Sequence, residues 1–228
     1  TLKALINRAK KDDIIKYDFD PFKDISFAKF RNIKTQKRAI TKEEIKRIAD
    51  LEIHDNPSMI DARNIFMFSY YNRGINFIDI AFLKWENIQQ NRLIYTRRKT
   101  KENFTIGLLP PVLTILEHYK NLYYENDRSF IFPILNYSYK TPKSIENRLH
   151  KMLGQVNLEL KEIATKAGIN TILTTYVARH SFATNLKRSG ISTTEISEAM
   201  GHDSEKTTKI YLDSFENNVL DKACEALL

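Results

Sequence analysis

Apolar residues recur every three or four positions along most of the chain, which is the spacing of one face of an α-helix. Start signals bound several of these segments: Thr41-Lys42-Glu43-Glu44 has the form of a capping box, and Pro57 stands at a first helical turn. The pattern predicts helices over residues 1–15, from 41 onward, 57–71, 76–85, 110–123, 144–167, 177–187, 192–200, 204–211 and 219–228.

One region has the composition of strands instead of helices. Arg92–Arg98 and Phe104–Leu108 are short and contain β-branched and aromatic residues, and the basic segment Lys99–Asn103 lies between them. These segments predict a β-hairpin with a basic loop. The fold class expected is therefore mainly α with a small antiparallel β-hairpin or sheet (α+β).

Composition limits the choice of partners. The 228 residues carry 36 Lys and Arg against 28 Asp and Glu, a formal net charge of +8, which favours a polyanionic partner but also fits a ribosomal or membrane-surface protein. The single cysteine, Cys224, excludes a disulfide within the chain and a Cys-rich zinc site. Without an apolar run of roughly 18 residues or a signal-peptide core, we expect a soluble cytoplasmic protein.

The chain divides into two parts by its sequence. Residues 1–39 contain a basic amphipathic segment that begins abruptly and an irregular basic linker, and we expect them to be the end of a truncated N-terminal helical domain. Residues 40–228 are expected to form the main domain. Basic clusters at 8–11, 34–38 and 97–101 are solvated charge by default, and on a nucleic-acid-binding protein they would follow phosphates.

The candidate chemistry lies near the C-terminus. Arg179, His202 and Tyr211 follow one another in an order that suggests covalent phosphoryl transfer on a nucleic acid. A tyrosine holds its proton up to about pH 10, so as a nucleophile it needs a base or a cationic pocket. Arginine stays protonated and presents a planar fork to two phosphate oxygens, and histidine has a pKa close to neutral.

The motifs around these residues resemble those of the tyrosine recombinase (phage-type integrase) family, from about residue 40 to the end. Arg179 stands in an Arg-His-Ser-Phe-Ala-Thr context, and Thr207 and Thr208 precede Tyr211 as in the family's Thr-Thr-x-x-Tyr pattern. Further segments that match are Met200-Gly201-His202-Asp203-Ser204, Phe82-Leu83-Lys84-Trp85 with Ile88, and Arg97-Arg98-Lys99-Thr100.

Two positions depart from the family pattern. Asn76 stands where the family has its first arginine, and it is interpreted as a helix N-cap. Arg73, three residues earlier and next to Gly74, is the candidate substitute. Tyr176 replaces the histidine of the His-x-x-Arg box; its phenol can donate a hydrogen bond to phosphate without carrying positive charge, or it is a half-buried aromatic residue at a helix start.

The resemblance implies a mechanism without metal or other cofactor. Tyr211 attacks a phosphate of duplex DNA, forms a 3′-phosphotyrosyl link and releases a 5′-hydroxyl. Arg179, Arg73, His202 and Tyr176 would stabilise the phosphate or, for His202, help deprotonate Tyr211. Lys99, with Lys101 as second choice, would protonate the leaving oxygen. His180 is interpreted as a supporting core residue.

The resemblance also implies partners. They are double-stranded DNA, three further copies in a homo-tetramer on paired sites, and accessory DNA-bending proteins, with no membrane; localisation at a bacterial nucleoid follows. The isolated chain is expected to be monomeric and to bind DNA weakly, because residues 1–39 resemble only the end of the family's core-binding domain. The segment 216–228 is expected either to dock on a neighbouring subunit or to fold back onto its own domain.

Three alternatives stay open. A type IB topoisomerase shares the chemistry but relaxes supercoils without exchanging partners. A non-catalytic DNA-binding relative is made credible by Asn76 and Tyr176. A generic basic scaffold for RNA or protein leaves the order of Arg179, His202 and Tyr211 unexplained.

Overall fold

The computed structural model describes residues 2–23, 25, 38–123, 130–202 and 208. The chain separates into two compact units, residues 1–36 and 37–228. The first unit contains α1 (Leu2–Lys11), a basic helix without a buried side chain, which ends earlier than the helix expected over residues 1–15. The division into domains at residue 39 stays a prediction.

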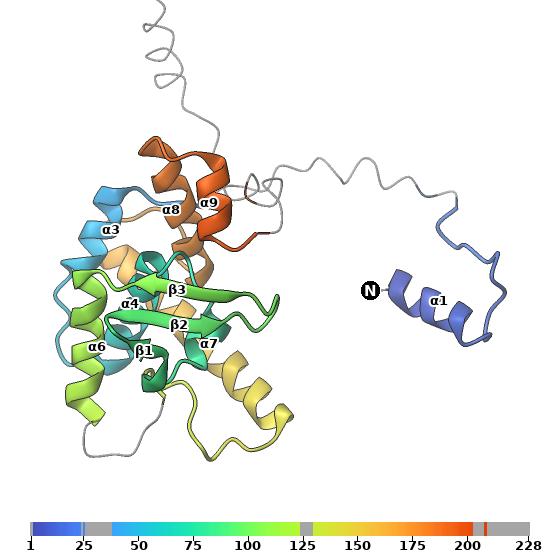
Figure 1. Ribbon diagram of the computed structural model, residues 1–228, viewed down its shortest axis with the longest axis horizontal. Coiled ribbons are helices and arrows are strands. Elements are labelled where there is room, and N and C mark those ends of the chain that lie inside the picture. The colour runs from blue at the N-terminus through green and yellow to red at the C-terminus, as the bar shows by residue number, and fades with distance from the viewer. Residues whose placement is uncertain (1, 24, 26–37, 124–129, 203–207, 209–228) are drawn as a thin grey trace, which may run out of the picture. The chain divides into compact units, whose positions relative to one another are not determined.

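The second unit consists mainly of helices with one small sheet, which confirms the fold class (Figure 1). Its strands are β1 (Ile88–Gln89), β2 (Arg92–Thr96) and β3 (Asn103–Gly107), preceded by a 3-10 turn at Trp85–Asn87. Its helices are α3 (Lys42–Ala49), α4 (Pro57–Tyr71), α5 (Phe77–Ala81), α6 (Pro110–Tyr123), α7 (Pro142–Lys166), α8 (Thr175–Arg188) and α9 (Thr193–Ala199).

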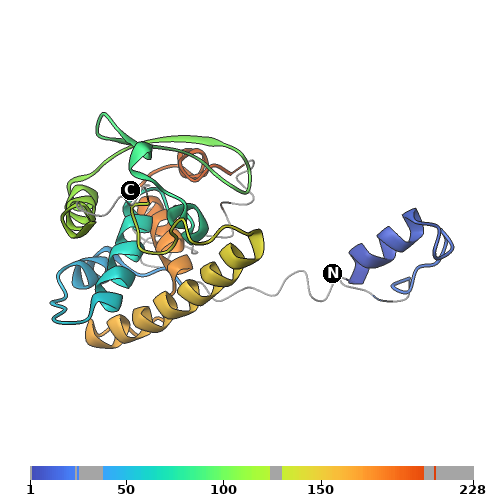
Figure 2. The same ribbon diagram turned by 90° about the horizontal axis from the view of Figure 1, so that it is seen from below.

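The elements form layers. Figure 2 shows the sheet on one side of the unit, the long helix α7 on the other, and α4 and α8 between them. Large side chains such as Phe66 and Phe68 of α4 are fully buried in this middle layer. A separate small cluster of Ala183, Ile196 and Met200 joins α8 to α9. No helix in the described ranges is both long and apolar enough to cross a membrane.

Most helix boundaries agree with the sequence prediction. Thr41 and Glu44 form the expected reciprocal capping box on α3, and Asn56 accepts a hydrogen bond from Met59 at the start of α4, just before Pro57. The predicted helices over 204–211 and 219–228 lie outside the described residues, apart from Thr208.

The helix expected to run to Trp85 is wrong in its length, because α5 ends at Ala81. The carbonyl of Leu83 accepts a hydrogen bond from the amide of Ile131 at 3.0 Å, and Lys84 forms an isolated β-bridge with Phe130. Pairing with a distant segment therefore competes successfully with the helical continuation of this apolar run.

The predicted hairpin is present, with an additional strand. Leu93 pairs with Ile106 and Tyr95 with Phe104 on the buried face, and the rings of Tyr95 and Phe104 stack at 5.1 Å. The two-residue strand β1 also pairs with β2 and was not predicted. Residues 97–102 form the hairpin loop, closed by a hydrogen bond from the Arg97 amide to the Glu102 carbonyl.

Candidate active site

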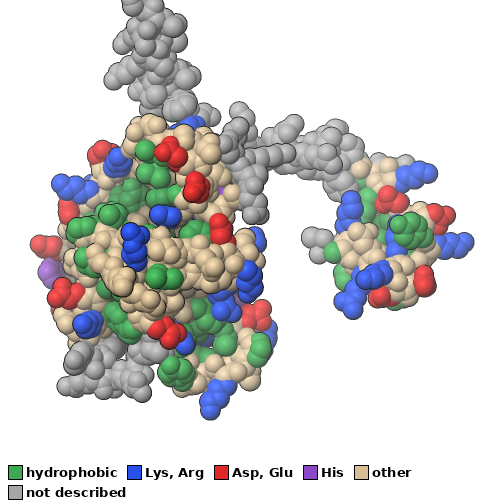
Figure 3. Space-filling view, in the orientation of Figure 1, with side chains coloured by type: hydrophobic (Ala, Val, Ile, Leu, Met, Phe, Trp, Pro, Cys, Tyr) green, Lys and Arg blue, Asp and Glu red, His purple; other side chains and the backbone are tan. Residues whose placement is uncertain are grey.

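A cleft of about 720 Å³ lies where the hairpin loop meets the helices. Four elements supply its walls: the segment that enters and begins α5, the hairpin loop, the middle of α7 and the start of α8. Three of the residues that the sequence analysis selected, Lys99, Tyr176 and Arg179, line this cleft together with Asn76. Lys and Arg side chains gather at the end of the hairpin (Figure 3). Arg98, Lys99 and Lys101 are exposed there.

Arg179 is a buried cation of the cleft, with 4% of its surface exposed. Its Nη1 donates to the carbonyl of Gly74 at 2.7 Å, and its Nη2 donates to the carbonyl of Met200 at 2.9 Å. Gly74 has a positive φ of 68°, and a Cβ on it would stand 2.8 Å from the Arg179 Cγ. The absence of a side chain at Gly74 thus lets the turn before α5 lie directly on the arginine.

His202 is presented by a turn at the end of α9. Gly201 adopts a left-handed conformation with φ 60°, and the His202 amide donates back to the Ser197 carbonyl at 3.0 Å. Such a glycine commonly ends a helix because it has no Cβ to clash. We call residues 200–202 the α9 turn.

The imidazole of His202 joins two other candidate residues. Its Nε2 lies 2.9 Å from Nη2 of Arg179, and its Nδ1 lies 2.8 Å from Oγ1 of Thr208. A guanidinium can only donate, so in this arrangement Nε2 accepts and Nδ1 carries the proton. His202 is thereby held between the Arg179 fork and a fully buried hydroxyl.

The hairpin loop is attached to its surroundings at two consecutive residues. Nη1 of Arg97 donates to the carbonyl of Gly201 at 2.9 Å, and the amide of Arg98 donates to Oδ1 of Asp79 at 3.0 Å. The prediction of solvated charge over 97–101 is therefore wrong for Arg97, which is only 8% exposed. Arg97 and Asp79 are the site residues that sequence reasoning missed.

Arg73 lies near the cleft without lining it. It occupies the turn before α5 with φ 59°, and its side chain is half-buried. Burial raises the pKa of Tyr95, and Asp79 raises it further, while the positive charges of Arg179, Arg97 and Arg73 act in the opposite direction. The positive charges of the three guanidinium groups thus favour the ionised form of one phenol, on the buried face of β2.

Asn76 and Tyr176 stand at the starts of two helices that face the cleft. Asn76 occupies the N-cap position of α5, as expected, but its side chain makes no capping hydrogen bond. Tyr176 lies in the first turn of α8, is 49% exposed and meets the ring of His180 edge-on at 4.8 Å. The N-terminus of α8 therefore opens toward the cleft, an orientation that favours an anion.

Tyr211 lies outside the described residues. It follows Thr208, the partner of His202, by three positions in the sequence. Within the described ranges, no group of three or more His, Cys, Asp or Glu side chains is arranged to hold a metal ion.

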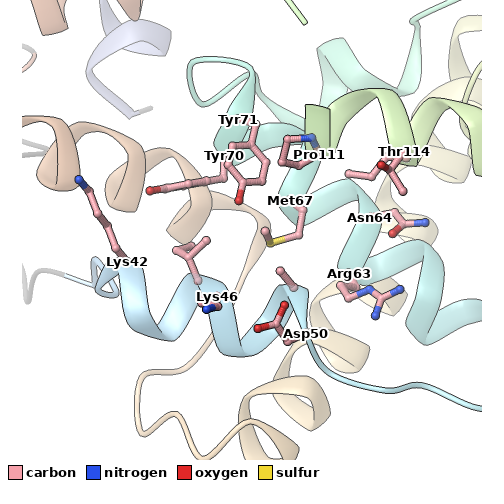
Figure 4. A pocket seen from close by; sticks show the side chains of 13 residues that line it. Lys42, Lys46, Asp50, Arg63, Asn64, Met67, Tyr70, Tyr71, Pro111 and Thr114 are labelled. Atoms are coloured by element: carbon pink, nitrogen blue, oxygen red, sulfur yellow. The ribbon is translucent and has the colours of Figure 1, made fainter. Parts of the chain in front are cut away.

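A second hollow of about 560 Å³ lies among α3, α4 and α6 (Figure 4). Its rim carries charges of both signs, Lys42, Lys46 and Arg63 against Asp50, and Tyr70 and Tyr71 form part of its wall. None of the candidate site residues lines it. Among the described candidates, Lys99, Tyr176, Arg179 and His202 therefore lie at the cleft and the adjoining α9 turn and not at this hollow.

Comparison with known proteins gives consistent matches. The sequence profile of the phage integrase family matches residues 38–218. The tyrosine recombinase XerA of Pyrococcus furiosus is 31% identical over 180 residues, which cover 78% of this chain and 58% of that protein. The chain thus spans less than two thirds of the length of this curated relative.

Solved structures share the fold at low sequence identity. The integrase of transposon Tn1549, in complex with a circular intermediate DNA, aligns with a TM-score of 0.65 and 15% identity, covering 99% of this chain and 76% of that one. A lambda integrase dimer bound to a core site aligns with a TM-score of 0.59 and 16% identity, covering 94% and 74%.

Proposed function

Because the chain belongs to the phage integrase family of tyrosine recombinases, we propose that it carries the catalytic site of a site-specific DNA recombinase. The observation that supports this most is the convergence of Lys99, Tyr176 and Arg179 on one cleft, with His202 in contact with Arg179. The hairpin loop that carries Lys99 is far in the sequence from α8 and the α9 turn, which carry the other three residues.

The proposed chemistry is an in-line displacement at a DNA phosphate. The Tyr211 oxygen attacks phosphorus, the bond from phosphorus to the 5′-oxygen breaks, and a 3′-phosphotyrosyl link remains on the enzyme. Negative charge develops on the non-bridging oxygens, and the fixed donors of Arg179 stabilise it more than they stabilise the substrate. The link conserves bond energy, so rejoining needs no ATP.

The other candidate residues take roles that fit their positions. Lys99 is exposed on the cleft and would protonate the leaving 5′-oxygen. His202 would accept the Tyr211 proton or donate to a phosphate oxygen, and in either role its Nε2 would exchange the contact with Arg179 for the reacting group. Tyr176 would donate from its phenol. Arg73 would add positive charge from the turn before α5, where the family's first arginine is replaced by Asn76.

Connectivity places a limit on the nucleophile. A stretch of three residues spans at most roughly 11 Å of backbone, so the proposal has Tyr211 act near Thr208. Because Thr208 Oγ1 lies 2.8 Å from Nδ1 of His202, the proposal puts the nucleophile, the histidine and Arg179 in one site.

The substrate and the assembly are part of the proposal. Duplex DNA fits the formal charge of +8 and the cationic side chains at the hairpin loop. The Tn1549 integrase structure contains a circular intermediate DNA, and the lambda integrase structure is a dimer bound to a core site. A homo-tetramer on two paired sites, with accessory DNA-bending proteins, would carry out full strand exchange.

A nicked suicide duplex tests the proposal. The full-length protein is incubated with a duplex that it binds with sequence preference, and denaturing gels are used to detect a covalent protein–DNA band. The wild type should give the band, Tyr211→Phe should abolish it, and Arg73→Ala should reduce it while leaving binding intact. Arg92→Ala, an exposed arginine at the start of β2, controls for the loss of one charge.

A DNA-binding relative without catalysis is the second candidate, favoured by Asn76 and Tyr176 at two positions of the family pattern. Tight, sequence-selective binding without a covalent band from the wild type would replace the recombinase proposal with this one. Relaxation of supercoiled DNA by the monomer, without a preferred site, would instead indicate a type IB topoisomerase.

A further inference from the structure

Arg97 differs from the other cations of the hairpin loop. Its neighbours Arg98, Lys99 and Lys101 are exposed, whereas only 8% of the Arg97 surface is exposed. Its Nη1 lies 2.9 Å from the carbonyl oxygen of Gly201 and 3.4 Å from that of Met200. The Arg97 guanidinium is therefore directed at backbone carbonyls, whereas its three cationic neighbours face solvent.

The acceptors of Arg97 belong to the α9 turn, which also receives Arg179. The carbonyl of Met200 accepts from Nη2 of Arg179 at 2.9 Å. Carbonyl groups at the end of a helix carry partial negative charge and favour cations. Two arginines from different elements therefore hold the turn that presents His202.

The hairpin also packs directly on this turn. A Cβ built on Gly201 would collide with the Glu102 carboxylate and the Phe104 ring. The end of the hairpin thus fills the space that a side chain at position 201 would need. The Arg97 hydrogen bond is one contact of a close junction, and it lies within that junction where water cannot compete for the carbonyl.

Lys99 lies two residues after Arg97 in the chain. The amide of the intervening Arg98 donates to Asp79 of α5. The backbone immediately before Lys99 is therefore held by two contacts, one to the α9 turn and one to α5. We propose that Arg97 is a positioning residue: it fixes the Lys99 backbone against the α9 turn, so that the proton donor and His202 keep one geometry relative to the scissile phosphate. This inference rests on the proposed function.

The reaction step at stake is departure of the 5′-oxygen. As the bond from phosphorus to that oxygen breaks, the oxygen keeps the electron pair and takes a proton from the Lys99 ammonium group. A displacement of about 1 Å in a reacting group can cost about 100-fold in rate. Arg97→Gln, which removes the guanidinium fork, should therefore slow cleavage by about 100-fold.

A modified substrate separates positioning of Lys99 from other effects. The suicide duplex is prepared with sulfur in place of the bridging 5′-oxygen at the scissile phosphate. A thiol ionises near about pH 8.5, so a thiolate leaves without receiving a proton. The defect of Lys99→Ala should disappear with this duplex, whereas the defect of Arg179→Ala should persist.

The inference predicts that Arg97→Gln behaves like Lys99→Ala. Its cleavage defect should largely disappear on the sulfur duplex, Arg97→Lys should retain part of the wild-type rate on the oxygen duplex, and the double variant Arg97→Gln/Lys99→Ala should be little slower than either single one. The control Arg92→Gln, at an exposed position of β2, the strand that leads into the hairpin loop, should cleave both duplexes at the wild-type rate.

Distinct outcomes overturn the inference and the proposed function. If the sulfur duplex rescues Lys99→Ala but neither Arg97 variant, Arg97 does not act through Lys99. If Arg97→Gln fails to fold, Arg97→Lys decides the question by the same comparison. If Lys99→Ala is not rescued, the role assigned to Lys99 is wrong, and if the wild type forms no covalent product with either duplex, the proposed function fails.

Discussion

Arg179 and Gly74 are matched to each other. The arginine donates from Nη1 to the Gly74 carbonyl at 2.7 Å, and its Cγ lies 2.8 Å from the place where a Cβ on Gly74 would stand. Residue 74 must therefore adopt a positive φ, offer its carbonyl and leave space for the arginine. Only glycine meets all three requirements without strain.

Gly74→Ala should damage both stability and catalysis. The left-handed conformation costs an alanine about 1–2 kcal/mol, and crowding against Arg179 adds about 1–3 kcal/mol. We expect urea denaturation to show that the free energy of unfolding falls by about 2–5 kcal/mol, the sum of these two costs. The covalent product should also form more slowly.

Gly190→Ala provides the matched control for Gly74→Ala. Gly190 also has a positive φ, of 86°, but nothing lies within 4 Å of its built Cβ. It should show only the conformational cost of about 1–2 kcal/mol and cleave DNA normally. Equal losses of stability in the two variants would contradict the crowding at Arg179.

Asp79→Ala should loosen the hairpin loop. The Asp79 carboxylate is buried and accepts from the amide of Arg98, and removing the acceptor should cost about 1–3 kcal/mol. Asp79→Asn keeps an oxygen at this place and should cost less. Cleavage of the suicide duplex should fall more in the alanine variant, whereas Glu86→Ala, an exposed carboxylate at 73% side-chain exposure, should leave it unchanged. Equal activity of Asp79→Ala and wild type would contradict the proposal that the hydrogen bond between Asp79 and the Arg98 amide holds the hairpin loop in place.

Thr208→Val should lower the rate of cleavage with little change in DNA binding. Valine fits the buried space of threonine but leaves Nδ1 of His202 without its hydroxyl partner, at a cost of about 1–3 kcal/mol. We expect cleavage to fall by about tenfold or more, with Thr208→Ser retaining most of the activity. Thr105→Val, at an exposed position of β3, is the control. A fully active Thr208→Val would remove this hydroxyl from the proposed site.

Asp61 should make stability depend on pH. Burial raises the pKa of its carboxyl, and the hydrogen bond from Tyr119 partly offsets this rise. Below about pH 3.9 the carboxyl is protonated in both folded and unfolded chains. As the pH rises through the higher folded-state pKa, the folded protein must release a proton from a partly buried carboxyl group, so this contribution to stability is lost.

Urea denaturation over a pH series shows whether Asp61 lowers the stability of the folded chain as the pH rises. The wild type should lose stability relative to Asp61→Asn as the pH rises above about 3.9. Glu195→Gln should give the opposite trend, because hydrogen bonds from Ser192 lower the pKa of Glu195. The stabilisation by Glu195 is present above the pKa of this carboxyl in the unfolded chain, and it is lost as the pH falls through the lower pKa in the folded chain. A constant difference between wild type and Asp61→Asn would contradict the raised pKa.

Local signals were sufficient for most of the fold. The capping box at Thr41, Pro57 at a first turn and the strand composition of Arg92–Arg98 each depend on nearest neighbours in the chain, and the corresponding elements were predicted. The end of α5 was not, because the pairing of Leu83 with Ile131 joins segments that no local pattern connects.

The same distinction applies to the site. Lys99, Tyr176 and Arg179 could be selected from family motifs, and the structure brings all three to one cleft. Arg97 could not be recognised as buried, since its partners are carbonyl groups of residues 200 and 201. Backbone acceptors leave no trace in the identity of the residues that carry them.

The reliance on backbone carbonyls at the α9 turn has a consequence for how such a site can diverge. Every residue type provides a carbonyl, so Met200 is free to change within the limits of its packing, whereas each donor that reaches the turn must keep its length and its fork. Substitutions at this turn should therefore be tolerated less well at Arg97, Arg179 and Gly201 than at Met200. A mutagenesis library of this region would best keep these three positions fixed and randomise the exposed residues around them.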